Sequence, residues 1–309
     1  MRALIVTNMY PTADQPALGS FVRDQVDALR QIEGVDLDVF SFEPGGAGAY
    51  ARAASDLYRR HRHDRFDVVH AHYGITAWPA FAARAGARAV TLHGTDLVHP
   101  RARPVTLAAL PFLDLVATVS DALATAIPRW AVRGRRAVLP AGVDLGRFHP
   151  IPRPEARSEL GLDPEQPCLL FPADPRRPEK HYDRAEAVAG NVRLLALGQI
   201  DPSRVPLYVN AANAVLVPSQ REGFGLAVLE ALACDVPVLA TPVGIHAVAL
   251  DGVEGTYCGP FDEAAWREAL APHLAHDDPR IHGRASAERF STDRMAAQVV
   301  AAWRTALQG

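Results

Sequence analysis

The chain has 309 residues and a formal net charge of −3 at pH 7, and this length suits two domains of about 150 residues better than one. Apolar residues make up 49% and charged residues 22%, which excludes a disordered chain. Residues 1–150 carry 17 basic and 14 acidic side chains, and residues 151–309 carry 15 and 21. Neither half is basic enough to indicate nucleic-acid binding.

The cysteines and the apolar runs bear on where the chain works. Three cysteines, Cys168, Cys234 and Cys258, match no metal-binding spacing and cannot all pair, which favours a reduced, cytoplasmic protein. Residues 1–7 predict a first strand and not a signal peptide. Since no apolar run reaches roughly 18 residues, any membrane contact is expected to be peripheral, at the inner face of the membrane. The slight positive bias of residues 1–150 could favour an anionic acceptor or a membrane surface, but a solvated face explains it equally well.

In the first half, strand-like runs alternate with helical patterns, which predicts a parallel sheet covered by helices. The expected strands are residues 3–7, 36–40, 68–70, 89–92, 115–119 and 137–139. The expected helices are residues 21–31, 51–61, 77–86 and 121–129.

A second series of the same kind follows a proline-rich stretch. Residues 148–154 hold prolines at alternate positions, which predicts a stiff, extended connector. The expected elements beyond it are strands 168–171, 193–197, 214–217 and 237–240, helices 205–212 and 225–233, and an amphipathic helix over 293–307. We therefore expect an N-terminal domain over 1–150, a second domain over 151–292, and a C-terminal helix over 293–309 that could pack back toward the first domain. Ligands of such folds bind at the carboxyl ends of the strands.

The most informative stretch is the loop and helix that follow the strand at 214–217. A polar loop with two glycines leads into a helix near Gly225, and a helix N-terminus suits a diphosphate because its N–H groups are free. Glu222 in the loop and Glu230 in the helix could accept hydrogen bonds from sugar hydroxyls. From these residues alone, a corner with two solvated glutamates is an equal alternative.

The pattern E-x-F-G-x-x-x-x-E, from Glu222 to Glu230, resembles the signature of family 4 glycosyltransferases, and residues 207–213 and 231–238 are similar to its flanks. The resemblance implies a retaining, metal-independent enzyme of the α/β GT-B architecture, with two Rossmann-like domains that face a central cleft. The N-terminal domain would lie on the acceptor side, and the second would hold the nucleotide-sugar donor.

The same resemblance assigns roles around the loop. It implies that Glu222 is catalytic and contacts the donor sugar's hydroxyls, and that Glu230 contacts the ribose. It also implies that the backbone amides of Phe224, Gly225 and Leu226 face the donor.

Lys180 is the only lysine among 32 basic residues, which indicates a site where a compact ammonium fits better than a planar guanidinium. It follows the strand at 168–171, where cations could neutralise a pyrophosphate; chance placement is the alternative. The resemblance implies that Lys180 and Arg177 bind the diphosphate. The family's usual Gly-Arg pair after this strand is missing, so Arg176 is a second choice for the arginine.

In the first half, His93 follows the strand at 89–92, and a structural histidine bonded to backbone is the alternative to a site residue. By resemblance His93 is catalytic and contacts the donor sugar, and Asp96 is a weaker candidate for acceptor contact. Gly19 precedes the helix at 21–31 and resembles the family's first-strand glycine, which lets the backbone reach the diphosphate. A plain helix-capping loop is the alternative there.

Two patterns could suggest a metal, and we predict none. Asp36 and Asp38 spell D-x-D within an alternating strand, where both share one face. His70 and His72 have no third ligand at a suitable spacing, and we interpret them as structural or acceptor-facing. The expected co-substrate is a UDP- or GDP-linked sugar, with no other cofactor.

The second half departs from the family in one place. Residues 198–204 alone join the strand at 193–197 to the helix at 205–212, where the family inserts another helix and strand, so we expect a reduced second sheet. The predicted function is transfer of a sugar by a hexosyltransferase-type enzyme (EC 2.4) to an unidentified glycan, lipid or small molecule. The alternatives are a GT-B nucleotide-sugar epimerase and a non-catalytic sugar-nucleotide-binding protein.

Overall fold

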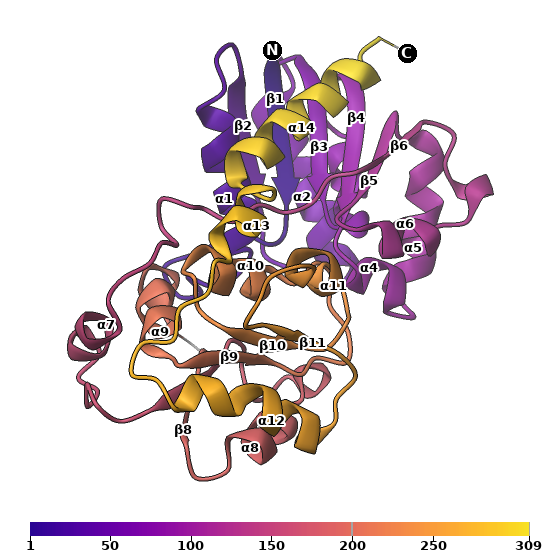
Figure 1. The fold of residues 1–309 in the computed structure, drawn as a ribbon. Coiled ribbons are helices and arrows are strands. Elements are labelled where there is room, and N and C mark those ends of the chain that lie inside the picture. The colour runs from indigo at the N-terminus through magenta and orange to yellow at the C-terminus, as the bar shows by residue number, and fades with distance from the viewer. Residues whose placement is uncertain (199, 309) are drawn as a thin grey trace. The chain divides into compact units, whose positions relative to one another are not determined.

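The structure is a computed structural model that describes residues 1–198 and 200–308. The chain divides into two compact units, one of residues 1–142 with 292–309 and the other of residues 143–291 (Figure 1). Each unit holds one parallel sheet covered by helices. The predicted α/β class is therefore confirmed.

The first unit is built on six parallel strands in the order β2-β1-β3-β4-β5-β6. The strands are β1 (Arg2–Thr7), β2 (Asp36–Ser41), β3 (Phe66–His72), β4 (Ala85–Leu92), β5 (Leu115–Thr118) and β6 (Arg135–Val138). The helices are α1 (Ser20–Arg30), α2 (Ala47–His61), α3 (Ala77–Ala80), α4 (Thr95–Val98), α5 (Ala102–Ala109), α6 (Asp121–Thr125) and α14 (Thr292–Ala306).

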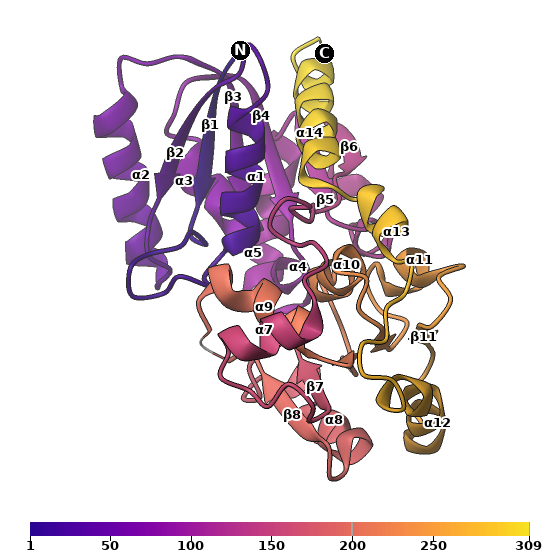
Figure 2. The same cartoon turned by 60° about the vertical axis from the view of Figure 1, so that its left-hand side comes forward.

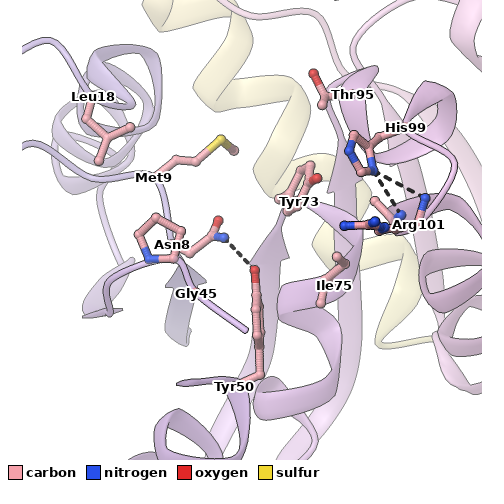
Figure 3. Close-up of a pocket in the computed structure, with 12 residues that line it drawn as sticks. Asn8, Met9, Leu18, Gly45, Tyr50, Tyr73, Ile75, Thr95, His99 and Arg101 are labelled. Carbon is pink, nitrogen blue, oxygen red and sulfur yellow. Dashed lines mark hydrogen bonds between the residues drawn. The ribbon is translucent and has the colours of Figure 1, made fainter. Parts of the chain in front are cut away.

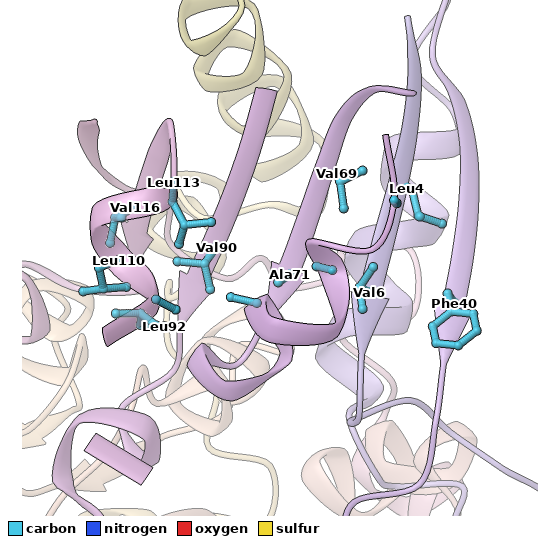
Figure 4. Packing of buried hydrophobic residues seen from close by; sticks show 14 of the residues in the cluster. Leu4, Val6, Phe40, Val69, Ala71, Val90, Leu92, Leu110, Leu113 and Val116 are labelled. Atoms are coloured by element: carbon cyan, nitrogen blue, oxygen red, sulfur yellow. The ribbon is translucent and has the colours of Figure 1, made fainter. Parts of the chain in front are cut away.

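Both faces of this sheet are buried, because parallel strands are covered by helices on each side. Along β1, Leu4 and Val6 point into a core closed by α2, α3 and α5, part of which Figure 4 shows. Ala3 and Ile5 alternate with them and point into a second core closed by α1 and α14. Because all six strands run parallel, their carboxyl ends lie at one edge of the sheet.

The C-terminal helix α14 belongs to the first unit and packs beside α1 across the sheet (Figures 1 and 2). Trp303 of α14 is fully buried. The first half of β4, near the end of this helix, is rich in small residues: Ala85, Gly86, Ala87 and Ala89. A Cβ at Gly86 would lie 3.2 Å from Cδ2 of Leu307 and 2.9 Å from the carbonyl oxygen of Asp67. The small side chains of β4 leave room for α14.

This arrangement overturns the prediction of a helix over 77–86. The helix α3 ends at Ala80, and residues 85–92 form β4, which pairs with β3 and β5. The alanines of this run favour a helix by intrinsic propensity, but tertiary packing under α14 selects the strand.

The second unit has a smaller sheet of five parallel strands in the order β11-β10-β9-β7-β8. The strands are β7 (Cys168–Phe171), β8 (Arg193–Ala196), β9 (Ala214–Val217), β10 (Val238–Ala240) and β11 (Tyr257–Cys258). The helices are α7 (Arg153–Glu159), α8 (Tyr182–Ala189), α9 (Val205–Ala211), α10 (Leu226–Ala233), α11 (His246–Leu250), α12 (Glu263–Leu274) and α13 (Arg284–Glu288). The reduced sheet agrees with the short connection between β8 and α9.

One face of the second sheet packs on α8 and α12 around the fully buried Trp266. On the other face lies α10, which contacts β9 and β10. Residues 218–225, between β9 and α10, therefore emerge at the carboxyl edge of this sheet.

The proline-rich stretch is docked on the second unit rather than running free. Arg280 donates to the carbonyl oxygen of Ile151 at 2.7 Å, and Arg284 donates to that of Phe148 at 2.9 Å. The helix α7 begins at Arg153, so the expectation of an extended chain through residue 154 is wrong for its last two positions. Pro154 stands in the first turn of the helix, where its missing N–H costs no hydrogen bond.

Candidate active site

In the second unit, the loop after β9 turns sharply into α10 at Gly225. This residue has φ 105°, and no side chain of the described residues caps the helix N-terminus. A Cβ at Gly225 would lie 2.4 Å from Nε2 of His246. His246 is buried, and its Nδ1 donates to the carbonyl oxygen of Thr241 at 2.8 Å, so the ring is held in place. Both the backbone angle and the close approach require glycine.

We expect Gly225→Ala to lower the free energy of unfolding by about 2–4 kcal/mol, because it adds backbone strain and a steric overlap with a fixed ring. Gly252→Ala is the matched control: Gly252 has φ 71° but open space around its Cα, so it should cost only about 1–2 kcal/mol. Urea denaturation of both variants measures the difference. Equal costs would mean that the His246 ring moves aside freely.

The loop brings together two residues that the sequence selected separately, Lys180 and Glu222. The Nζ atom of Lys180 donates to both carboxylate oxygens of Glu222, each at 2.6 Å, and the two side chains are only 13% and 9% exposed. The hydroxyl of Ser219 also donates to Glu222 at 2.8 Å. Lys180 closes the short 3₁₀ turn Pro178–Lys180, and the backbone N–H of Gln220 donates to the carbonyl oxygen of Glu179 in that turn at 2.9 Å.

The two candidate arginines have other partners. Arg177, 55% exposed, binds the carboxylate of Glu179 at 2.8 Å, and Arg176, 73% exposed, binds that of Asp174 at 2.7 Å. The hydrogen bonds from Arg176 lower the pKa of Asp174 to about 2. Among the described contacts, neither guanidinium joins the Lys180–Glu222 pair, so a role for Arg177 at a diphosphate stays a prediction.

The remaining donor-side candidates lie around the start of α10. Phe224 is buried, and its carbonyl oxygen accepts from the N–H of Ile245 at 2.8 Å. Leu226 is the first residue of α10, and Glu230 lies inside the helix, partly exposed. These positions place the amides of residues 224–226 at the helix N-terminus. Their contact with a donor stays a prediction.

In the first unit, His93 directly follows β4 and is partly exposed. Its ring lies 4.9 Å from that of Phe21 and 5.3 Å from that of His72. The Nε2 atom of His93 is 3.1 Å from Nδ1 of His72. Burial lowers the pKa of His93 to about 4, so its imidazole is neutral at pH 7 and Nδ1 is the ring nitrogen left for a ligand.

Asp96 does not face an acceptor, so that prediction is wrong. Its side chain is fully buried and accepts from the backbone N–H groups of His93, Gly94 and Gly74, the shortest at 2.8 Å. Burial raises the pKa of this carboxyl. Asp96 instead ties the loop after β4 to the loop after β3, which fixes the position of His93.

Gly19 caps α1 in the left-handed conformation, with φ 63°, and no side chain in the described part of the chain caps this helix. A Cβ at Gly19 would lie 2.2 Å from the carbonyl oxygen of Met9. Local packing therefore accounts for the glycine, as the capping alternative proposed. A contact of Gly19 with the diphosphate stays a prediction.

A cavity of about 420 Å³ opens at the carboxyl edge of the first sheet (Figure 3). Tyr50 and Tyr73 line it with polar groups, and the Tyr50 hydroxyl accepts from Asn8 at 2.9 Å. Of the twelve lining residues, only Arg101 carries a fixed charge. The sequence selected none of these residues as site residues, because they come from four separate stretches of the chain, residues 8–18, 44–50, 73–75 and 95–102.

Neither of the two metal-like patterns is arranged as a metal site. Arg2 binds Asp38 at 3.0 Å and lies 3.8 Å from Asp36, and His70 is buried against Trp303 and Thr91. No group of three or more His, Cys, Asp or Glu side chains within residues 1–198 and 200–308 could hold a metal ion. Over the same residues, no helix has the length and apolar character to cross a bilayer.

Comparison with known proteins decides the family. A model described as Glycosyltransferase Family 4 matches residues 22–147, and one described as Glycosyl transferases group 1 matches residues 168–276. The D-inositol 3-phosphate glycosyltransferase of Actinosynnema mirum is 31% identical over 332 aligned positions, which cover 84% of this chain and 77% of that protein. The chain belongs to the family 4 glycosyltransferases.

A second sequence relative agrees on the family of this glycosyltransferase, and solved structures agree on its fold. The D-inositol 3-phosphate glycosyltransferase of Segniliparus rotundus is 33% identical, but the match covers 56% of this chain and only 47% of that protein. Sucrose-phosphate synthase from Thermosynechococcus elongatus has the same fold, with a TM-score of 0.75, 21% identity and 99% of each chain covered. The structure of Anabaena HepE in complex with UDP matches with a TM-score of 0.70 and 17% identity, and the match covers 99% of this chain and 100% of that one. The predicted GT-B architecture is thereby confirmed.

Proposed function

We propose that this glycosyltransferase moves a sugar from a nucleoside-diphosphate donor to a hydroxyl acceptor, with retention of configuration and without a metal. The Lys180–Glu222 pair carries the proposal. An ammonium and a carboxylate that neutralise each other in a nearly buried place fit a ligand that offers a phosphate beside a hydroxylated ring, since each group then exchanges its partner for part of the ligand. Solved structures of the same fold contain UDP and UDP-glucose, which supports a nucleotide-sugar donor.

In this proposal Lys180 and the N-terminus of α10 stabilise the leaving diphosphate by charge, in the place where other enzymes use a metal. Glu222 and His93 hold the sugar's hydroxyls. The diphosphate takes the proton of the acceptor hydroxyl as the new glycosidic bond forms on the face that the diphosphate leaves. The protein then contributes positioning and charge stabilisation, and no side chain forms a covalent bond to the sugar.

For the acceptor we propose the cavity of the first unit. Its volume suits a small ligand, the tyrosine hydroxyls and Asn8 suit hydroxyl groups, and Arg101 suits an anionic substituent. Several relatives are named for inositol 3-phosphate, a molecule that carries both hydroxyl groups and an anionic phosphate. Peripheral membrane contact and a cytoplasmic location stay predictions.

The donor is identified by thermal-shift titration with UDP, GDP and ADP and their common sugars, in EDTA, on wild type and Lys180→Ala in parallel. Binding stabilises the folded state by RT ln(1 + [L]/Kd), about 2.7 kcal/mol at a hundredfold excess over Kd. We expect one base to stabilise wild type but not the variant. If no nucleotide stabilises wild type, the reduced second sheet has lost the donor site and the non-catalytic binding protein becomes the better hypothesis. Free nucleotide and an altered sugar without acceptor would indicate an epimerase.

A further inference from the structure

Three histidines and a tryptophan form a continuous column of rings inside the first unit. The column runs from Trp303 on α14 through His70 and His72 on β3 to His93. The ring centroids of His70 and His72 lie 5.0 Å apart at an interplanar angle of 15°, and those of His72 and His93 lie 5.3 Å apart at 22°. His70 and His72 are 0% and 1% exposed. The site histidine is thus the exposed end of a buried stack.

The position of the proton on His70, at the far end of the stack, follows from the hydrogen-bond partners of its two ring nitrogens. The indole N–H of Trp303 can only donate, and it lies 2.8 Å from Nδ1 of His70. Nδ1 of His70 therefore carries no proton, and the proton is on Nε2, which donates to the hydroxyl of Thr91 at 2.8 Å. Burial lowers the pKa of His70 to about 3, so this neutral form is kept at pH 7.

The next ring, His72, has one ring nitrogen with a partner and one without. Its Nδ1 lies 3.1 Å from Nε2 of His93, and its Nε2 is buried without a hydrogen-bond partner among the described residues. Burial also lowers the pKa of His72 well below its usual value. Since both rings are neutral, one of these two facing nitrogens must donate to the other.

The orphaned Nε2 of His72 decides between the two directions. If His93 were the donor, His72 would carry its proton on Nε2, as a buried N–H with no acceptor. If His72 is the donor, its Nε2 is a buried lone pair. Orphaned buried N–H groups are rarer in proteins than unsatisfied acceptors, so His72 donates through Nδ1–H.

We propose that His72 is a positioning residue, which donates a hydrogen bond to Nε2 of His93 and so holds the proton of His93 on Nδ1. The consequence for the reaction rests on the proposed function: His93 then offers an N–H donor, not a lone pair, to a hydroxyl oxygen of the donor sugar. His93 would fix the pose of the sugar and could not act there as a base.

The tautomer can be read without any nucleotide, from ¹⁵N-histidine NMR of the ligand-free protein, with the His93 signals assigned through His93→Gln. We expect Nδ1 of His93 in the protonated, pyrrole-type range and Nε2 in the unprotonated, pyridine-type range. The reverse pattern would overturn the proposal while leaving the nucleotide-sugar function untouched. Failure of the nucleotide titration would leave this result valid.

Two variants separate positioning from packing. His72→Asn keeps an amide where Nδ1 stood, so Nε2 of His93 should keep its hydrogen bond. His72→Phe keeps the ring but removes the donor, so the ¹⁵N signal of Nε2 of His93 should move to the range of a pyridine-type nitrogen without a hydrogen bond. His72→Phe should also reduce the preference for UDP-glucose over UDP about fivefold, which is the loss of one hydrogen bond, and His72→Asn should restore it. His61→Phe is the control, since His61 is a buried histidine at the C-terminal end of α2 and pairs with Asp64. An unchanged ¹⁵N signal of Nε2 of His93 in His72→Phe would contradict the proposal.

Discussion

Lys180→Ala is expected to weaken binding of the nucleoside diphosphate by about 10- to 150-fold. The variant removes a charge-assisted contact to phosphate, worth about 1.5–3 kcal/mol. It also leaves the carboxylate of Glu222, 9% exposed, without its cation and next to an incoming anion. Isothermal titration with the diphosphate and with its sugar form measures both effects. Lys180→Arg should not restore affinity, because the guanidinium cannot reproduce the compact ammonium between the two oxygens.

Glu222→Gln is the complementary change, and it should separate sugar from phosphate. Affinity for the nucleoside diphosphate alone should stay the same or rise, because Lys180 loses its competing carboxylate. Affinity for the sugar-bearing donor should fall about fivefold, because the amide accepts fewer hydroxyl hydrogen bonds than a carboxylate. The double variant then shows whether the two residues act together, since contacting residues give non-additive effects.

The arginines next to Lys180 provide the controls for this pair. Arg176→Ala removes a cation that is 73% exposed and paired with Asp174, so it should leave diphosphate affinity within about twofold. Arg177→Ala tests the sequence-based prediction directly. If Arg177→Ala weakens diphosphate binding as much as Lys180→Ala does, the arginine leaves Glu179 when the donor binds. If Lys180→Ala binds the diphosphate as wild type does, the donor site is not at this pair.

The sequence predicted the strands that precede Lys180 and Glu222 well, because the information that defines them is local. Strands 168–171 and 214–217 were predicted with their observed ends, since short apolar runs between turn residues define a buried strand by themselves. The pairing of Lys180 with Glu222 could not be derived from either residue, as 42 positions separate them. It depends on the neighbouring positions of β7 and β9 in the sheet.

The surroundings of His93 in the first unit were harder to predict, because the decisive contacts there are long-range. His93 was selected from its place after a strand. The role of His72 needs a ring contact to His93 and a link to Trp303, 233 positions from His70 in sequence. Asp96 was misjudged for a related reason: an aspartate in a polar loop indicates exposure, but here three backbone N–H groups surround it. The number of N–H donors around a loop carboxylate is visible only in the fold.

The second large effect is expected from Arg153, a residue that the sequence placed only in a connector. Its side chain is fully buried, and it donates to the carbonyl oxygens of Ala212 at 2.9 Å and Asp277 at 3.0 Å and binds the carboxylate of Asp278 at 2.8 Å. Burial lowers its pKa to about 10, so the guanidinium stays charged at pH 7. It joins the start of α7 to the chain after α9 and to the loop before α13.

We expect Arg153→Met to lower the free energy of unfolding by about 3–5 kcal/mol, because it leaves buried carbonyl oxygens without donors. Asp278→Asn should cost under about 1 kcal/mol, since that carboxylate is 38% exposed and the carbonyl contacts remain. Arg193→Met, on the exposed end of β8, controls for loss of charge. Calorimetry gives the totals, and hydrogen exchange should show faster opening of α7 and α9. A buried ion pair can be replaced by an apolar side chain at no cost when the site repacks. If Arg153→Met leaves the free energy of unfolding unchanged, packing, and not this arginine, holds the connector on the second unit.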